Sequence, residues 1–568
     1  MSPSTLYPLV ARLVLTLAVT GLLAALLPTR GTMDGWSLFP PLAAIGVTLA
    51  TGRLILGLSA AILSGAWLTL PSTTPWYWFP WAVVERALVD FIWISLYDSF
   101  QLYILGFTAA LIGMIRVIAL AGGTQGIAQL LVARAADARS TRVATLVMGL
   151  AIFFDDYANT LVVGTTMRPI TDRFKISREK LAYLVDSTAA PIAGIAVIST
   201  WIGYEVLLFD GIMRDLGTDI SGYELFFRAL PTRFYCLFTL AFVILSTLLR
   251  RDFGPMLRAE RRAQQSGQVL APNVKPMTGK HDDEIRPATG VQAHWATAAA
   301  PIGLVISGVL VGMYWDTSST AVVLQTRSQY GFFSQDYWIA ILREANAPKV
   351  MFIAALAGSS LAFLIALTRR DSTSDRLLLK PTHVLKTWIQ GIPAIYYALI
   401  ILVLAWAIKE TCKATSTGDY LSALLSGLFD PTLLPLLVFL LSSLVAFSIG
   451  TSWTTMTILL PTMLPLAFEL GGAPLGVLVA SAVLDGAIFG DHCSPISDTT
   501  VLSSIAAGSD HIDHVKTQLP YAATTMAVAA LCGYLGSTLL YSPTIGLFLG
   551  LAALVAILLL IGRNPDTA

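Results

Sequence analysis

The chain has 568 residues and a net charge of +1 at pH 7; 55% of its residues are hydrophobic and only 12% are charged. Soluble domains carry about 25% charged residues, so this composition indicates a membrane protein. Because no domain carries a basic surface, a nucleic-acid partner is not expected. The cysteines lack a short paired spacing and predict packed thiols rather than a disulfide framework: Cys236, Cys412, Cys493 and Cys532.

The first apolar run, LVLTLAVTGLLAALLP, follows Arg12. Runs of this kind suit the ~30 Å hydrocarbon core of a bilayer. No small-residue cleavage site followed by a polar domain ends the run, so we expect an uncleaved helix with a cytoplasmic N-terminus. It belongs to a predicted group of N-terminal membrane helices in residues 1–98.

Residues 99–249 are predicted to form the first of two inverted repeats. Two basic segments, Arg134–Arg142 and Arg168–Lys180, should both be cytoplasmic, because short basic loops stay on that side. The chain between them must therefore enter the membrane and return. This predicts a hairpin over residues 143–180 with the turn DDYANT near the midplane, where such backbone must be enclosed by protein or border a water-filled cavity.

The rest of the first repeat is predicted to cross outward and then return. A broken helix over residues 181–204 leads to the acidic segment Glu205–Glu224, which suits the outside. A span near Arg233–Leu249 then brings the chain back. The polar stretch 250–292 is predicted to be a cytoplasmic linker.

The second half repeats this plan upside down. Scaffold helices are expected in residues 293–389, and the second repeat in residues 390–541. That repeat contains a hairpin over residues 433–470, interrupted by SIGTSWTT, and a broken helix over residues 474–507, interrupted by GDHCSPISDTT. A C-terminal helix in residues 542–568 leaves the C-terminus cytoplasmic.

These segments predict an all-α polytopic membrane protein with about 12 transmembrane helices. Two re-entrant hairpins lie in inverted-topology repeats. Broken helices that meet near the midplane in such repeats are typical of secondary transporters.

Polar residues gather at the predicted helix breaks. Carboxylates inside a membrane are costly and usually serve ion or proton pathways. Hydroxyl, amide and carboxylate oxygens are ligands that hard cations prefer, so we expect Na⁺ to bind at a subset of these residues and protons to exchange there. The candidate ion- and proton-binding residues are Asp155, Asp156, Asn159, Thr160, Asp186, Ser187, Thr188, Thr451, Ser452, Asp491, Ser494, Asp498 and Thr499, and Ser448 lies in the same set. His492 and Asp485 are candidates for a proton path.

Simpler interpretations compete at several of these positions. Asp155 or Asp156 could cap the half-helix after the turn, and Asp186 could cap another. Asp485 could be an ion ligand or the partner of a buried hydroxyl. In DHIDH (Asp510–His514), a solvated helix start is favoured over a pH sensor. The His492–Cys493 pair is a weak zinc signal, because zinc sites usually show paired ligands at short spacing.

No Gly-x-x-x-x-Gly-Lys-Ser/Thr loop is present, so ATP hydrolysis is not expected and ion gradients should drive transport. We expect no enzymatic activity, no catalytic residues and no cofactor besides the transported Na⁺ and H⁺.

Two long stretches resemble the NhaC-type sodium/proton antiporter family of the ion transporter superfamily: FFDDYANTLVVGTTMRPITDRFKISREKLAYLVDSTAAPIAG and GDHCSPISDTTVLSSIAAGSDHIDHVKTQLPYA. The resemblance runs from the first spans to about Tyr521. It implies cation/proton exchange across a prokaryotic cytoplasmic membrane, an elevator-like movement of the hairpin-bearing domain, and often a dimer. The positions that match the family's polar core are Asp155, Asp156, Asn159, Thr160, Asp186, Ser187, Thr188, Asp491, Ser494 and Asp498.

The leading hypothesis is a Na⁺/H⁺ antiporter that exchanges cytoplasmic Na⁺ for external H⁺ by alternating access, with the lipid bilayer and the two ions as its partners. The alternative is a Na⁺- or H⁺-coupled transporter of a small organic acid or amino acid, whose carboxylate would be held by half-helix N-termini. A passive channel is a third class.

Overall fold

The computed structural model describes residues 3–29, 34–51, 53–93, 99–132, 136–197, 199–272, 274, 288, 290–370, 377–390, 400, 403–404, 406–408, 410–425, 430–495 and 497–565. Within these ranges the regular structure is helical, and pairing of the β type is limited to two isolated bridges. The all-α prediction is confirmed.

Six of the described helices are long and apolar enough to cross a membrane: Ala296–Thr317, Lys349–Leu367, Pro431–Ile449, Ser452–Cys493, His511–Leu539 and Pro543–Leu560. A seventh span is added if Gly222–Thr232 and Phe234–Leu249, which meet at 48°, are counted as one. The chain is therefore a polytopic membrane protein. The larger number of spans predicted from the sequence is not confirmed, and residues 391–399, at the start of the predicted second repeat, lie outside the described part.

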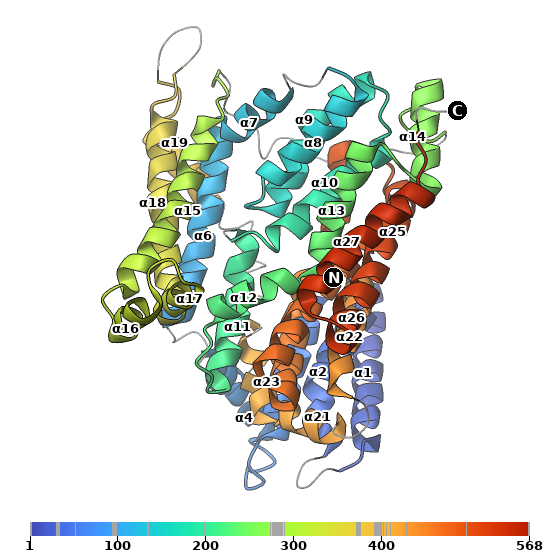
Figure 1. Cartoon of the computed structure of the whole chain (residues 1–568). Coiled ribbons are helices and arrows are strands. Elements are labelled where there is room, and N and C mark those ends of the chain that lie inside the picture. The colour runs from blue at the N-terminus through green and yellow to red at the C-terminus, as the bar shows by residue number, and fades with distance from the viewer. Residues whose placement is uncertain are drawn as a thin grey trace.

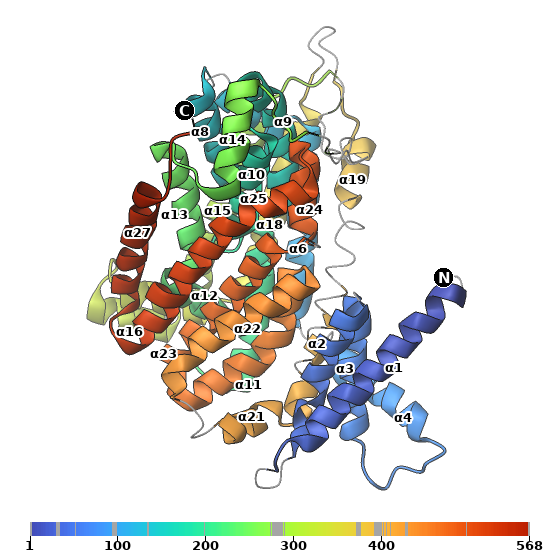
Figure 2. The same cartoon turned by 90° about the vertical axis from the view of Figure 1, so that its right-hand side faces the viewer.

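The N-terminal helices form a group of their own beside the main body (Figure 2). The group consists of α1 (Pro3–Leu26), the 3-10 turn η1 (Gly35–Leu38), α2 (Phe39–Thr51), α3 (Leu54–Leu68), α4 (Phe79–Glu85) and the π-helical η2 (Arg86–Trp93). Successive helices pack on each other, and α21 (Thr417–Leu425) contacts η1.

Three long helices stand side by side along one face of the molecule (Figure 1): α6 (Ser99–Leu120), α15 (Ala296–Thr317) and α18 (Ala347–Leu367). α18 packs on both of the others, and the Ser359 hydroxyl donates to the Ala110 carbonyl of α6 at 2.8 Å. Shorter helices flank them: α7 (Gly123–Val132), α16 (Ala321–Tyr330), α17 (Gln335–Glu344) and α19 (Pro381–Ile389). α16 and α17 were not expected from the sequence.

The first repeat is built from short helices, each followed by a break. They are α8 (Ala138–Ala151), α9 (Asp156–Arg173), α10 (Arg178–Ala193), α11 (Thr200–Asp215), α12 (Gly222–Ala229), η3 (Leu230–Thr232) and α13 (Phe234–Leu249). A polar residue precedes several of these helices, because its side-chain oxygen can accept a hydrogen bond from a free backbone amide of the first turn. The capping residues of α8 to α11 are Asp137, Asp155, Ser177 and Ser199. Hydrogen bonds from Ser140 hold the pKa of the Asp137 carboxyl below its usual value.

α8 and α9 pack against each other and form a hairpin whose two ends lie at the same end of the molecule. Glu260, on α14 (Gly254–Ser266), shows this directly. Its carboxylate accepts from Arg142 near the start of α8 at 2.5 Å and from the Ser177 hydroxyl just after α9 at 2.7 Å. The chain thus runs away from this end of the molecule along α8 and comes back to it along α9.

The second half contains η5 (Pro431–Leu433), α22 (Leu434–Ile449), α23 (Ser452–Cys493), α24 (Asp498–Ala507), α25 (His511–Val528), the π-helical η6 (Ala529–Leu535), α26 (Gly536–Leu539) and α27 (Pro543–Leu560). α23 has 42 residues. A straight helix of that length would measure about 63 Å, twice the core of a membrane. The helix instead turns back at Gly472, which has a φ of 63°, so Ser452 at its start bonds Asp491 near its end.

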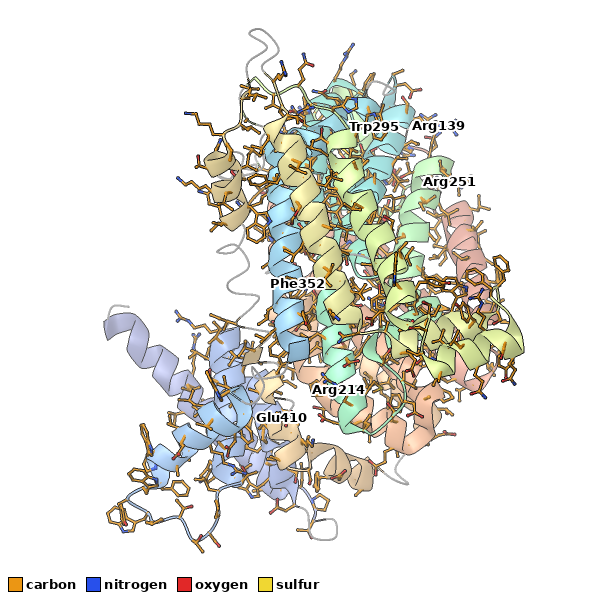
Figure 3. All side chains as sticks on the ribbon, turned by 90° about the vertical axis from the view of Figure 1, so that its left-hand side faces the viewer. Arg139, Arg214, Arg251, Trp295, Phe352 and Glu410 are labelled. Carbon is orange, nitrogen blue, oxygen red and sulfur yellow. The ribbon has the colours of Figure 1, made fainter. Side chains whose placement is uncertain are left out.

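Residues predicted to lie on opposite sides of the membrane lie at opposite ends of the molecule (Figure 3). Arg139 and Arg251 are at one end, together with Trp295, whereas Arg214 and Glu410 are at the other. This arrangement agrees with the separation of these segments deduced from loop charge.

One expectation about these segments is corrected: the break in the first broken helix lies at residues 194–199, so Asp186 sits inside α10 and does not cap a helix. The acidic segment Glu205–Glu224 is mostly helical, and both of its terminal glutamates are buried. The first part of the predicted linker contains a helix, α14.

Candidate functional site

The site lies where the breaks of the two repeats meet. At the tip of the first hairpin, the Phe154 carbonyl accepts from the amide of Thr200, the first residue of α11. At the tip of the second, the Trp453 carbonyl accepts from the Tyr204 hydroxyl at 2.7 Å, and the two rings stack. α11 therefore contacts both tips.

Asp186 is the centre of the polar cluster. It is 1% exposed, and α10 presents it to α24 and α25. Its carboxylate accepts from Gln518 at 2.6 Å and from Thr500 and Ser503 at 3.2 Å each. The Nε2 atom of His514 lies 3.3 Å away. One carboxylate thus has four side-chain partners on two helices.

Asp491 forms a second carboxylate centre beside the first. Ser452, from the tip of the second hairpin, donates to it at 2.9 Å, and Ser497, the cap of α24, donates at 2.5 Å. The Thr500 hydroxyl lies 3.3 Å from the Asp491 carbonyl and also reaches Asp186, so it links the two centres.

His492 joins these centres to α13. Its Nε2 atom lies 3.0 Å from the Ser187 hydroxyl, and its Nδ1 atom lies 2.8 Å from the Tyr235 hydroxyl. Its backbone carbonyl accepts from Gln518. The imidazole is therefore flanked by two hydroxyl groups that can relay a proton.

Asn159 ties the first hairpin to α10. Its amide nitrogen donates to the carbonyls of Gly149, Ile152 and Thr188 at 2.6, 3.1 and 3.0 Å. The last contact joins α9 to α10 at Thr188, which lies two residues after Asp186 in the sequence.

Several buried oxygens in this region have no hydrogen-bond partner in the described part of the chain: Asn159 Oδ1, Thr160 Oγ1 and Gln518 Oε1. A buried polar atom without a partner costs about 1–3 kcal/mol, so such atoms mark a place where a ligand or ion can bind. In the described residues no group of three or more His, Cys, Asp or Glu side chains is arranged to hold a metal ion.

The remaining predicted residues have local roles. Asp155 caps α9 by accepting from the Ala158 amide at 2.8 Å, and Asp156 is buried in the first turn, where it accepts from the Tyr157 amide. Ser448 and Thr188 bond carbonyls of their own helices. Thr451 precedes α23 without a side-chain capping bond.

Around the second break, Ser494 donates to the Phe447 carbonyl at 2.7 Å, and Thr499 pairs with Ser497 at 2.9 Å. Asp498 is the first residue of α24, and its side chain lies outside the described part. Capping explains Asp155, whereas it does not explain Asp186.

Asp485 belongs to a separate buried cluster. It accepts from Arg233 Nε at 2.9 Å, from the Tyr235 amide at 2.7 Å and from the Tyr534 hydroxyl at 2.8 Å. Arg233 also pairs with Glu205 at 3.2 Å. Asp485 therefore has a buried hydroxyl as one partner, as the simpler interpretation allowed, and an arginine as another.

Sequence reasoning missed several residues of the site: His514, Gln518, Ser503, Tyr235 and Arg233. His514 is wholly buried, so the expected solvated helix start is wrong for this histidine. A helix-face argument could have found it, because His514 and Gln518 are four residues apart and share one face of α25.

Comparison with known proteins places the chain in a family. Residues 192–537 match the model of the Na⁺/H⁺ antiporter family. An uncharacterized protein of Haemophilus influenzae is 31% identical over 532 residues, which are 93% of this chain and 96% of that protein. The malate-2H⁺/Na⁺-lactate antiporter of Bacillus subtilis is 34% identical over 131 residues, or 23% of this chain and 28% of that protein.

A structural comparison supports the fold alone. The structure of MtrF from Neisseria gonorrhoeae, described as one of a class of antimetabolite efflux pumps, matches with a TM-score of 0.51 and 10% sequence identity over 95% of this chain and 96% of that one. The family match begins after the first hairpin, so it includes Asp491 and His492 but neither Asn159 nor Asp186. It nevertheless spans more than half of the protein, and the chain belongs to the Na⁺/H⁺ antiporter family.

Proposed function

We propose that this secondary transporter exchanges cytoplasmic Na⁺ for external H⁺ at the Asp186 centre. The observation that carries the proposal is a carboxylate buried among polar side chains, with His514 in contact with it and His492 linked to it through Gln518. A negative charge in a membrane interior costs about 2.5–3.5 kcal/mol on insertion scales and needs a cation beside it. That cation can be Na⁺ or a proton.

Oxygen atoms near Asp186 suit Na⁺. Hydroxyl groups of Thr500 and Ser503 already face the carboxylate, and the partnerless Oε1 of Gln518 belongs to a side chain that contacts it. Hard cations prefer such oxygen ligands. We propose that Na⁺ binds Asp186 together with a subset of these oxygens and those of the first hairpin.

The proton has a place in the same contact network. When Nε2 of His514 donates to Asp186, Nδ1 is the free basic atom, and it has no partner in the described residues. A proton there would turn His514 into an imidazolium paired with the carboxylate. Na⁺ and the imidazolium would then compete for one negative charge, which makes binding of the two ions mutually exclusive.

Alternating exposure of the centre would follow from the helix breaks. We propose that the two hairpins are re-entrant, that they lie in inverted repeats, and that the hairpin-bearing helices move as an elevator against a scaffold, as in other transporters with broken helices. We also propose a prokaryotic cytoplasmic membrane as the location, cytoplasmic termini and a homodimer.

The second candidate is a carrier of a small organic acid coupled to Na⁺ or H⁺. The partial match to the malate-2H⁺/Na⁺-lactate antiporter favours it. Half-helix N-termini could hold a substrate carboxylate, and Arg233, the arginine of the buried cluster, already pairs with Glu205 and Asp485. The described centre is built around the carboxylate of Asp186, however, which attracts a cation and repels an anionic substrate. The geometry therefore supports ion exchange better.

The test is transport by the full chain in proteoliposomes. A Na⁺ gradient is imposed and the internal pH is recorded, first without and then with a small organic acid or an amino acid. Sodium-dependent proton movement without any organic solute is the expected result. Proton movement that begins only when the solute is added would replace ion exchange by the second candidate.

A further inference from the structure

The interior of the protein holds a second group of charges that the exchange centre does not use. It consists of Glu205 on α11, Arg233 before α13 and Asp485 on α23, which are all at most 1% exposed. Two carboxylates share a single guanidinium group. If both carboxylates were ionised, the cluster would have one negative charge in excess, in a place where water cannot compensate it.

The two carboxylates are not equivalent. Asp485 accepts from the Arg233 Nε atom, a backbone amide and a tyrosine hydroxyl, all at 2.7–2.9 Å. Within the described part of the chain, the side chain of Glu205 accepts hydrogen bonds from the Arg233 Nη1 atom alone, which lies 3.4 and 3.2 Å from its two oxygens. Three short bonds stabilise an ionised carboxylate far better than one long contact, so the fixed negative charge belongs to Asp485.

The other ionisable groups around Glu205 do not supply the missing cation. Arg233, just before α13, and Asp485 of α23 are the charged groups that act on Glu205. Cys236 of α13 accepts from Arg233, and Tyr534 of η6 donates to Asp485. α6, α10 and α12 also pack against α11, and they contribute no ion pair to Glu205 in the described residues. Arg233 is thus the single positive charge for two acids in this part of the chain.

We infer that Glu205 is a proton-binding site, separate from the exchange centre, which holds a proton while the transporter changes conformation. Binding converts the carboxylate to the neutral acid, and Arg233 keeps its own proton and pairs one to one with Asp485. The cluster is then electrically neutral. Loss of the proton leaves a net negative charge in the membrane interior, which opposes any movement of these helices.

The cluster is connected to the exchange centre. Tyr235 lies two residues after Arg233; its amide donates to Asp485 and its hydroxyl contacts His492. A change in how Arg233 is shared therefore acts on a helix that touches the exchange centre. The expected effect of Glu205 on the transport rate rests on the proposed ion exchange. Proton binding by Glu205 does not depend on that proposal.

The experiment compares Glu205→Gln with the unmodified protein, both as full chains in proteoliposomes, from mildly acidic to alkaline pH. Glutamine imitates the neutral acid, so the exchange rates should agree at acidic pH. Above the titration midpoint the neutral fraction of Glu205 falls about tenfold per pH unit, and the ratio of variant to unmodified rate should rise accordingly. A ratio that stays constant with pH overturns the inference.

The matched control is Glu224→Gln, which neutralises another buried glutamate that pairs with the half-exposed Arg228. Its rate ratio should not change with pH. A structural defect alone would lower the rate at every pH and cannot make a variant faster than the unmodified protein at alkaline pH.

Infrared spectroscopy gives a readout that needs neither Na⁺ nor transport. The unmodified protein should show the carbonyl band of a protonated carboxylic acid that disappears at alkaline pH and is missing in Glu205→Gln. If that variant does not fold, Glu205→Asp should keep the band with a shifted midpoint, and an unchanged band in Glu205→Asp contradicts the inference. Absence of Na⁺-driven proton flux at every pH would refute the proposed ion exchange. The infrared band would then still test whether Glu205 binds a proton.

Discussion

Asp186 receives hydrogen bonds from two helices of the other repeat, α24 and α25. An amide side chain at this position would keep its size and lose the negative charge for which Na⁺ and the proton compete in the proposed function. The contacts of His514 and Gln518 would lose their ionised acceptor as well.

Asp186→Asn should therefore abolish sodium-driven proton movement, with a loss larger than the about 10–100-fold that removal of an outer partner costs. The assay is internal pH in proteoliposomes under a Na⁺ gradient. Asp172→Asn is the control, because Asp172 pairs with Arg178 in a partly exposed position at 3.0 Å and should leave exchange intact. Exchange at the unmodified rate in Asp186→Asn would remove this residue from the site.

Gln518 orients Asp186 and also contacts the His492 carbonyl. Gln518→Leu has a similar volume and lacks both polar atoms, so the apparent Na⁺ affinity should fall by about 10–100-fold. Binding of labelled Na⁺ to purified protein measures this. Gln329→Leu, on the exposed surface of α16, should bind Na⁺ as the unmodified protein does. Equal affinities of the two variants would contradict a positioning role for Gln518.

At the scale of the element, α14 fastens one end of the site-bearing helices. Glu260 is wholly buried and pairs with Arg142 of α8, Lys180 of α10 pairs with Asp252 at 2.8 Å, and Arg262 reaches Glu179 at 2.9 Å. These ion pairs join the linker to the hairpin and to α10.

Glu260→Gln removes one charged partner of a buried ion pair with Arg142 and should lower the free energy of unfolding by about 3–5 kcal/mol. Denaturant unfolding in detergent micelles measures the change. Asp90→Asn breaks the exposed pair of Asp90 with Arg86 and should cost only about 0–1 kcal/mol. Similar losses in both variants would mean that α14 does not hold the bundle together.

Gly472 turns α23 back on itself with a φ of 63° and a ψ of −158°, a region open to glycine alone. Gly472→Ala should cost about 1–3 kcal/mol of stability through backbone strain. Gly303→Ala is the matched control, because Gly303 is helical, open space surrounds its missing Cβ, and alanine should stabilise it by up to about 1 kcal/mol. Thermal unfolding that shifts both variants in the same direction would contradict this account of the turn.

At the scale of the molecule, loop charge and interrupted apolar runs predicted the helical class and the breaks near residues 450 and 494, whereas the break expected at Asp186 lies at residues 194–199. The basic flanks at Arg142 and Ser177 do meet, through Glu260. Gly450, with a φ of 77°, ends α22 inside the interruption predicted for the second hairpin. Serine and aspartate cap helix starts through side-chain hydrogen bonds, and glycine adopts the left-handed backbone at helix ends. These local preferences depend on residue type, so they can be recognised in a sequence.

Pairings between distant helices could not be predicted in this way. His514 and Asp186 are separated by 328 residues, and Arg233 and Asp485 by 252. Whether a charged residue faces solvent or a buried partner depends on packing that local pattern does not encode. The acidic composition of the segment that begins at Glu205 suits the outside, and it gives no sign that Glu205 itself is buried beside Arg233.

The two halves of the chain interlock rather than stand apart. Tyr204 of the first half contacts the tip of the second hairpin, and Gln518 and Ser503 of the second half reach Asp186 of the first. A movement at one break is therefore transmitted to the other, as the proposed alternating exposure of one centre requires.

The central claim is that Na⁺ and H⁺ compete for the Asp186 centre, and proton release on Na⁺ binding tests it most directly. NaCl is added to the purified full chain in weakly buffered detergent solution, and the pH is recorded against choline chloride. The unmodified protein should release protons in a saturable way, and Asp186→Asn should release none. Sodium binding without proton release from the unmodified protein, or undiminished release from Asp186→Asn, would contradict the claim.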